Sequence, residues 1–183
     1  MSFATFDRRK NRTMNKKVII QASSNRKGNT NTVVHYLNKN NEFDIIDLKG
    51  KNIGHFDYDF TNSDDDFIPL MEEVIANYDS IIFATPVYWY SMSGILKVFF
   101  DRLSDLLHNK KELGRQLRGK NMGMISNSND NDRFSWYQKP FIESANYLGM
   151  HYLGDVHAWF DGTKIHKDAK EIIDTFRKQI HTH

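Results

Sequence analysis

The stretch KVIIQASSNRKGNTNTVVHYLN, residues 17–38, places an apolar run, a polar loop and a helix pattern directly after one another. The apolar run, residues 17–22, has the length of a β-strand. Val33, Val34 and Leu37 recur at the spacing of one helix face. A strand that leads through a short loop into a helix is the first half of a βαβ unit, so this stretch predicts an α/β fold.

The rest of the chain repeats this alternation of strand and helix patterns. The predicted strands are residues 17–22, 43–48, 80–84, 122–126 and 151–157, and the predicted helices are residues 32–38, 65–77, 93–107, 136–148 and 168–180. Nearly continuous apolar runs such as residues 81–84 indicate strands that are buried on both faces of a sheet. The alternation therefore predicts a three-layer α/β/α sandwich with a five-stranded parallel sheet.

The composition is that of one globular domain. Of the 183 residues, 39% are hydrophobic and 13% are aromatic, which is enough for a core. The absence of cysteine excludes disulfides, thiolate nucleophiles and cysteine-ligated zinc or iron–sulfur clusters. We expect residues 1–15 to form a disordered N-terminal tail and residues 16–183 to form a single domain.

The charge and hydropathy patterns exclude several classes of partner. The net charge of +2 comes without the dense cationic stripe of a nucleic-acid-binding protein. No apolar run reaches the length of about 18 residues that spans a membrane, and the polar N-terminus does not resemble a signal peptide. The histidines match no metal-binding motif, so we predict no metal site. We expect a cytoplasmic protein with neither nucleic acid nor a membrane as partner.

The loop of residues 23–30 has the composition of an anion site. It leads into a helix, where unpaired N–H groups and the helix dipole favour negative charge. Ser23 and Thr30 offer hydroxyl donors, and Gly28 lets the backbone approach a ligand closely. The loop matches neither a Walker A loop nor G-x-G-x-x-G, which favours the phosphate of a mononucleotide. The alternative is an ordinary turn with Asn29 or Thr30 as the helix N-cap.

A second unusual loop, residues 85–94 (TPVYWYSMSG), follows the third predicted strand. Tyr88, Trp89 and Tyr90 are consecutive large aromatic residues in a connection where exposure to solvent is expected. A flat conjugated ring is a natural partner, because aromatic stacking is worth about 0.5–1.5 kcal/mol beyond the area it buries. The alternatives are burial of these side chains under the next helix or in a dimer interface.

These two loops resemble those of a known family. Residues 86–94 (PVYWYSMSG) closely resemble the signature of the NAD(P)H-dependent FMN reductase family, and the similarity continues to Arg102. The loop with Ser23 and residues 28–30 resembles the phosphate loop of the same family. The two motifs occur in the family's order, and the resemblance covers residues 17 to 157.

The resemblance implies a flavodoxin-like FMN-binding domain, commonly a homodimer. Such a domain takes hydride from NADH or NADPH and passes electrons to a flavin, quinone, azo or nitro acceptor. No catalytic side chain is implied, because the cofactor supplies the hydride chemistry. The residues implied around FMN are Ser23, Asn25, Arg26, Gly28, Asn29 and Thr30 near the phosphate, Pro86, Val87, Tyr88, Trp89 and Tyr90 along the ring and ribityl chain, and Ser126 and Asn127 after the fourth strand.

The chain departs from the family pattern at several positions. Ala22 stands where the first loop usually opens with Gly, and Asn25 or Arg26 stands at the usual Arg. After the fourth strand, the polar run of residues 126–132 (SNSNDND) replaces a glycine-rich loop. Two alternatives therefore stay open. One is an electron carrier of flavodoxin type, which the positive net charge disfavours, and the other is a binding module that has lost its flavin.

Overall fold

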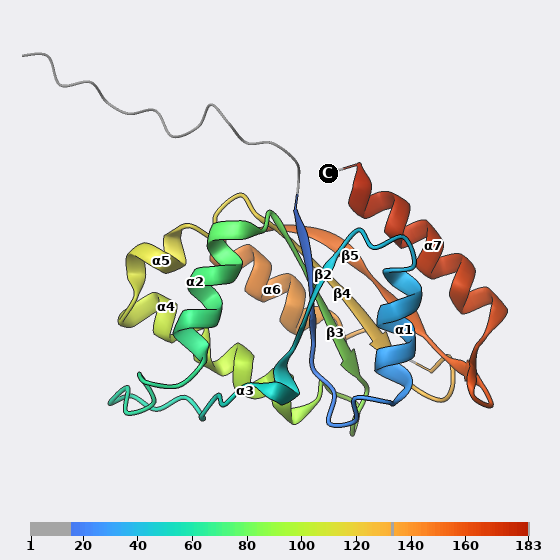
Figure 1. Ribbon diagram of the computed structural model, residues 1–183, viewed down its shortest axis with the longest axis horizontal. Helices are drawn as coiled ribbons and strands as arrows, with labels where there is room; N and C mark the ends of the chain where they lie inside the picture. The colour runs from blue at the N-terminus through green and yellow to red at the C-terminus, as the bar shows by residue number, and fades with distance from the viewer. Residues whose placement is uncertain (1–15, 133, 183) are drawn as a thin grey trace, which may run out of the picture.

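A five-stranded parallel sheet forms the centre of the computed structural model, which describes residues 16–132 and 134–182 (Figure 1). The strands are β1 (Lys17–Gln21), β2 (Asp44–Asp47), β3 (Ser80–Pro86), β4 (Asn121–Asn127) and β5 (His151–Ala158). Their order is β2-β1-β3-β4-β5, and every neighbouring pair is parallel. This confirms the predicted sheet. The predicted N-terminal tail, residues 1–15, lies outside the described residues.

Helices cover both faces of the sheet and complete the predicted three-layer sandwich (Figure 1). They are α1 (Asn29–Leu37), α2 (Phe67–Asn77), α3 (Gly94–Arg102), α4 (Asp105–His108), α5 (Lys111–Arg115), α6 (Lys139–Leu148) and α7 (Lys167–His181), with a short 3-10 helix η1 (Leu48–Gly50). Apolar side chains of α1 and α7 form one core with the strands, and those of α2, α3 and α6 form the other. A hairpin of β6 (Phe160–Asp161) and β7 (Lys164–Ile165), which the sequence pattern did not indicate, follows β5.

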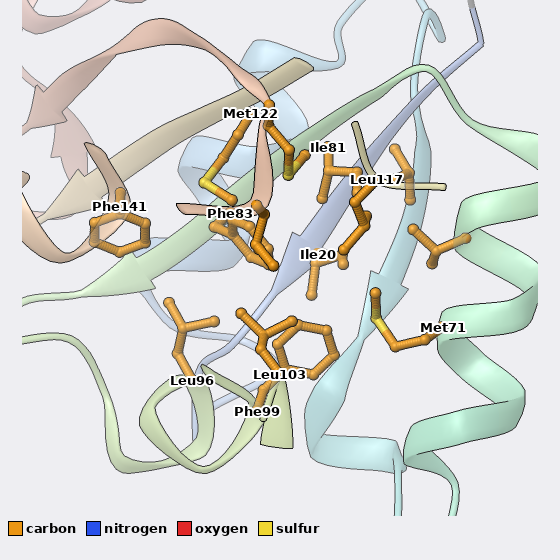
Figure 2. Close-up of a cluster of buried hydrophobic side chains, with 14 of the residues drawn as sticks. Ile20, Met71, Ile81, Phe83, Leu96, Phe99, Leu103, Leu117, Met122 and Phe141 are labelled. Atoms are coloured by element: carbon orange, nitrogen blue, oxygen red, sulfur yellow. The ribbon is translucent and has the colours of Figure 1, made fainter. Parts of the chain in front are cut away.

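The strands separate the two cores because successive side chains of a strand point to opposite faces of the sheet. β3 is buried along its whole length. Its Ile81 and Phe83 pack in the core of α2, α3 and α6, whereas Ile82 and Ala84 pack in the core of α1 and α7. Figure 2 shows the core of α2, α3 and α6, where Phe83 lies among side chains such as Phe141. Burial on both faces explains why the strands have nearly continuous apolar sequences.

Several helices begin or end at residues other than those predicted. α1 begins at Asn29 instead of residue 32, and α6 begins at Lys139 instead of residue 136. The first turn of α1 lies at the edge of the sheet and is polar, so the apolar periodicity does not include it. The single helix predicted over residues 93–107 is divided into α3 and α4. α3 ends at Arg102, whose side chain is buried in a cluster of ion pairs.

The last residue of α3, Arg102, is a buried cation that is only 1% exposed. Its Nε donates to Asp105 Oδ2 at 2.8 Å, and its Nη1 forms an ion pair with Asp65. The guanidinium also donates to the backbone carbonyls of Gly54 and Asn62, at 3.1 and 3.2 Å. Although burial opposes the charge, the two carboxylates hold the pKa of Arg102 above its ordinary value. Arg102 thereby fastens the connection between β2 and α2 to the end of α3.

Candidate functional site

The carboxyl ends of β1, β3 and β4 surround a cavity of about 570 Å³, which we call the central cavity. It is lined by Ser23, Asn25, Gly28, Asn29 and Thr30 from the loop after β1, by Pro86, Val87 and Tyr88 at the end of β3, and by Asn127, Ser128, Asn129 and Asp130 at the end of β4. The strand order reverses between β1 and β3, because β2 and β3 lie on opposite sides of β1. Ligands of open α/β sheets bind at such a reversal, beyond the carboxyl ends of the strands.

Hydrogen bonds within the loop after β1 hold it in a compact turn. The backbone N–H of Asn25 donates to Ser23 Oγ at 3.3 Å, and that of Lys27 donates to Asn25 Oδ1 at 3.0 Å. Gly28 has a φ of −88°, so no left-handed conformation requires a glycine there. A Cβ at this position would lie 3.1 Å from Asn25 Nδ2. A side chain at residue 28 would therefore be in tight contact with Asn25.

The amino end of α1 has the donors of an anion site. Gly28 is its N-cap, in place of the predicted Asn29 or Thr30, and no side chain caps the helix. The first-turn N–H groups have no intrahelical partner and carry the positive end of the helix dipole. Ser23 and Thr30, which are 3% and 2% exposed, add hydroxyl groups. The described residues that line the central cavity include no lysine or arginine, so neutral donors and the dipole would hold an anion here.

A chain of hydrogen bonds joins the three loops around the central cavity. Thr30 Oγ1 donates to Asn127 Oδ1 at 2.8 Å, which connects α1 to the end of β4. The backbone N–H of Val87 donates to the carbonyl of Asn127 at 2.8 Å, which continues the pairing of β3 with β4. Ser93, the N-cap of α3, donates to the carbonyl of Ala22 at 2.7 Å. These hydrogen bonds join protein groups only, and they fix the positions of the loops around the cavity.

After β3 the chain makes a two-residue turn with aromatic residues at both corners. Tyr88 and Ser91 exchange backbone hydrogen bonds of 2.9 and 3.0 Å, and the corner residues Trp89 and Tyr90 have φ angles of 48° and 64°. Turns with two such φ angles strongly prefer Asn-Gly. Each aromatic residue at a corner therefore costs about 1–3 kcal/mol of backbone strain. Trp89 is 92% exposed, so its side chain is not buried under the next helix.

A second cavity of about 450 Å³, which we call the outer cavity, shares Val87, Ser128 and Asp130 with the central cavity. The other residues that line it are Trp89, Tyr90, Asp132, Phe134 and Tyr137. Phe134 stacks on Trp136 with ring centroids 4.3 Å apart, and Tyr90 meets Phe134 edge-on at 5.2 Å. We call Trp89, Tyr90, Phe134 and Trp136 the aromatic wall: the first three line the outer cavity, and Trp136 stacks on Phe134.

The structure places two of the predicted site residues outside both cavities. Arg26 Nε forms an ion pair with Asp47 Oδ2 at 2.7 Å, at the end of β2. Ser126 is fully buried, and its Oγ lies 2.9 Å from His157 Nδ1. The remaining predicted residues line the central cavity, except the two corner aromatics, which line the outer one.

The residues predicted around FMN end at Asn127, and the sequence leaves open whether the remaining polar run, residues 128–132, contacts flavin. Residues 128–130 line the central cavity beside Asn127, and two of them line the outer cavity as well. The available signal was a polar run directly after a buried strand next to the reversal of strand order. His157, which contacts Ser128 and Asp130 from β5, was not predicted either, because it lies in an apolar strand pattern.

Comparison with known proteins identifies the family. The model of the family described as NADPH-dependent FMN reductase matches residues 15–164. The chain belongs to the NADPH-dependent FMN reductase family. This FMN reductase family member is 31% identical over 121 residues to YwqN of Bacillus subtilis (strain 168), whose name describes an NAD(P)H-dependent FMN-containing oxidoreductase. The match covers 65% of this chain and 62% of YwqN, so the chain spans less than two thirds of that relative's length.

Solved structures confirm the flavodoxin-like fold of this family member. The Trp repressor binding protein from Bacillus subtilis is similar with a TM-score of 0.70 and 21% identity, over 90% of this chain and 97% of that one. An FMN-dependent NADH-azoreductase from Bacillus anthracis, solved in complex with FMN, has a TM-score of 0.62 and 15% identity, over 91% of this chain and 99% of that one. Such identities show a shared fold and carry no argument about substrates.

Proposed function

We propose that this chain is an FMN-dependent oxidoreductase that takes hydride from NADH or NADPH and reduces a small-molecule acceptor. The observation that carries the proposal is the meeting, around one cavity, of the loop of residues 23–30, the end of β3 with Tyr88, and the polar residues 127–130 at the end of β4. Family membership supports the same activity. Among residues 16–132 and 134–182, no helix is long and apolar enough to cross a membrane.

The residues present suit FMN. A volume of about 570 Å³ is within the range of small-molecule sites. The amino end of α1 and the Ser23 hydroxyl would hold the phosphate, and Thr30 would join them when its hydroxyl turns to the phosphate from Asn127, to which it donates in this structure. Residues 86–88 and 127–130 would border the ring. FMN, when bound, accepts hydride and passes electrons on, and this chemistry belongs to the cofactor. The chain's task is to bind the flavin and to orient its exposed face.

The outer cavity suits a flat acceptor. Its aromatic wall consists of Trp89, Tyr90, Phe134 and Trp136, and rings of this kind favour stacked or edge-on contacts with a planar conjugated molecule. Flavins, quinones, azo compounds and nitroaromatic compounds share this shape. The strain in the turn supports a role for its two aromatic side chains, because strained conformations concentrate at ligand sites.

The decisive experiment is a visible spectrum of the purified protein after addition of FMN, followed by anaerobic mixing with NADH or NADPH. We expect saturable flavin binding and rapid bleaching of the flavin absorbance by at least one nicotinamide. A protein that binds FMN but is bleached by neither would be an electron carrier. A protein that does not bind FMN would be a binding module that has lost its flavin.

Trp89 and Tyr90, at the corners of the turn, should lower the stability of the protein but strengthen acceptor binding. The double variant Trp89→Asn, Tyr90→Gly introduces the residues that the turn prefers, so we expect the free energy of unfolding to rise by at least about 1 kcal/mol. Loss of stacking should raise KM for a quinone acceptor about tenfold. Urea unfolding and steady-state kinetics measure the two effects. The Kd of FMN should stay constant, because neither residue lines the central cavity; an unchanged KM would contradict the assignment of the outer cavity.

We also infer that the protein forms a homodimer through its aromatic wall. Trp89, Tyr90 and Trp136 are 92%, 61% and 55% exposed. Contiguous exposed aromatic side chains mark interaction surfaces. We expect Trp136→Glu to raise the dimer dissociation constant at least about tenfold in analytical ultracentrifugation. Tyr147→Glu, at an exposed position on α6, is the control that should leave the dimer intact. A monomeric wild-type protein would refute the inference.

A further inference from the structure

His157, near the end of β5, lies directly behind the polar loop that follows β4, and it is 7% exposed. Its Nδ1 lies 2.9 Å from Ser126 Oγ. Its Nε2 lies 3.0 Å from Ser128 Oγ and 3.1 Å from the backbone carbonyl oxygen of Asp130. One buried imidazole thus contacts Ser126, near the end of β4, and two residues of the loop that borders both cavities.

The chemistry of these partners assigns the proton on the ring. A backbone carbonyl only accepts hydrogen bonds, so the contact with Asp130 requires a proton on Nε2. In the neutral ring Nδ1 then accepts from the hydroxyl of Ser126. Ser128 Oγ donates to the carbonyl of Asp130 at 2.6 Å, so it can accept from the same Nε2–H. A neutral ring with its proton on Nε2 can therefore make these three contacts, with the Ser126 hydroxyl directed to Nδ1 and not to the carbonyl of Val156, 3.5 Å away.

The loop needs such a support because it leaves the sheet at this point. The backbone N–H of Ser128 donates to the carbonyl of Ala158 at 3.1 Å, which extends the pairing of β4 with β5 by one residue. Beyond this bond, the contacts from His157 hold Ser128 and Asp130 against the sheet. Asn127, one residue earlier, is held from the opposite side by Thr30. The loop is thus fixed between the anion site and β5.

We propose that His157 is a positioning residue of the flavin site, which fixes residues 128–130 in the conformation that borders the isoalloxazine ring. This inference rests on the proposed binding of FMN. His157 does not line either cavity, so it acts on the cofactor only through the loop. Residues 128–130 carry polar side chains where the family resemblance implies a glycine-rich loop. The contacts from His157 hold Ser128 and Asp130 in place.

The test compares His157→Phe with His157→Gln. Phenylalanine fills the same space without hydrogen bonds, and glutamine keeps a donor and an acceptor. His151→Phe, at the exposed start of the same strand, is the matched control. For each variant we would measure the Kd of FMN, the visible spectrum and circular dichroism of the bound flavin, and amide hydrogen exchange of residues 128–130 in the flavin-free protein.

We expect His157→Phe to raise the Kd of FMN about tenfold, to shift the spectrum of the bound flavin, and to speed exchange of the loop amides. His157→Gln should recover part of the affinity and the spectrum, and His151→Phe should match the wild type. If His157→Phe does not fold, His157→Gln and the shorter His157→Asn carry the test, and equal Kd values and exchange rates for these two variants and the wild type overturn the inference.

The exchange measurement separates this inference from the proposed function. Wild-type protein that fails to bind FMN would refute the flavin site, whereas exchange in the flavin-free protein would still report on the support of the loop. Wild-type Kd, spectrum and exchange rates in a folded His157→Phe variant would overturn the role of His157 and leave the flavin site standing.

Discussion

Replacing Ser23 and Thr30 together with alanine should weaken FMN binding at least about 100-fold while the protein stays folded. Hydrogen bonds to a charged group are worth about 1.5–3 kcal/mol each, and each 1.4 kcal/mol is a tenfold change in Kd. The described residues that line the central cavity include no cationic side chain, so nothing of that kind compensates for the lost hydroxyls. Fluorescence titration with FMN measures the Kd, and far-ultraviolet circular dichroism checks the fold.

The Arg26→Ala variant is the control for this experiment. The family resemblance places Arg26 near the phosphate, whereas the structure pairs it with Asp47, with its side chain 58% exposed. We therefore expect a Kd within about threefold of the wild type, since exposed ion pairs contribute little. A large loss of affinity in Arg26→Ala together with none in the double variant would show that the phosphate is held by the arginine instead of the hydroxyls.

Replacing Arg102 with methionine should destabilise the protein by about 3–5 kcal/mol, because removal of one partner leaves buried carboxylates without their counter-charge. The side chains of Asp65 and Asp105 are only 8% and 6% exposed, so water cannot replace the guanidinium. The carbonyls of Gly54 and Asn62 lose their donor at the same time. Urea unfolding of the wild type and the variant gives the difference in free energy.

Arg115→Met is the matched control, because Arg115 forms an ion pair with Glu112 over the same sequence spacing on the surface. The two side chains are 61% and 84% exposed, and we expect a change within about 0.5 kcal/mol. Equal effects of the two substitutions would contradict a structural role for the buried cluster.

The buried cluster also makes stability depend on pH in the acid range. Burial raises the pKa of Asp65, but the hydrogen bonds from Arg102 and from the backbone N–H groups of Phe67 and Gly54, together with the charge of Arg102, outweigh it and hold that pKa below its ordinary value. A depressed native pKa gives stability that is present above the unfolded value of about 3.9 and is lost as pH falls through the native value. The free energy of unfolding should therefore fall below about pH 4, and this part of the slope should be smaller in Asp65→Asn.

The amino-acid sequence is enough to predict the alternation of strands and helices, the parallel sheet and most residues that line the central cavity. These features follow from local patterns. Apolar runs such as residues 81–84 are buried on both faces. The polar loop after β1 and the aromatic loop after β3 meet because parallel strands end at the same edge. The family resemblance then assigned FMN to that edge.

Contacts between side chains that are far apart in the chain are known only from the folded structure. Arg26 forms an ion pair with Asp47 of β2, and Arg102 forms one with Asp65 from the connection between β2 and α2. His157 of β5 contacts the loop of residues 128–130. No local periodicity encodes these contacts, because each depends on a strand or helix brought alongside by the order of the sheet. A charged or polar residue looks the same in sequence whether it meets a ligand, an ion-pair partner or a loop, and only the neighbours that folding supplies distinguish them.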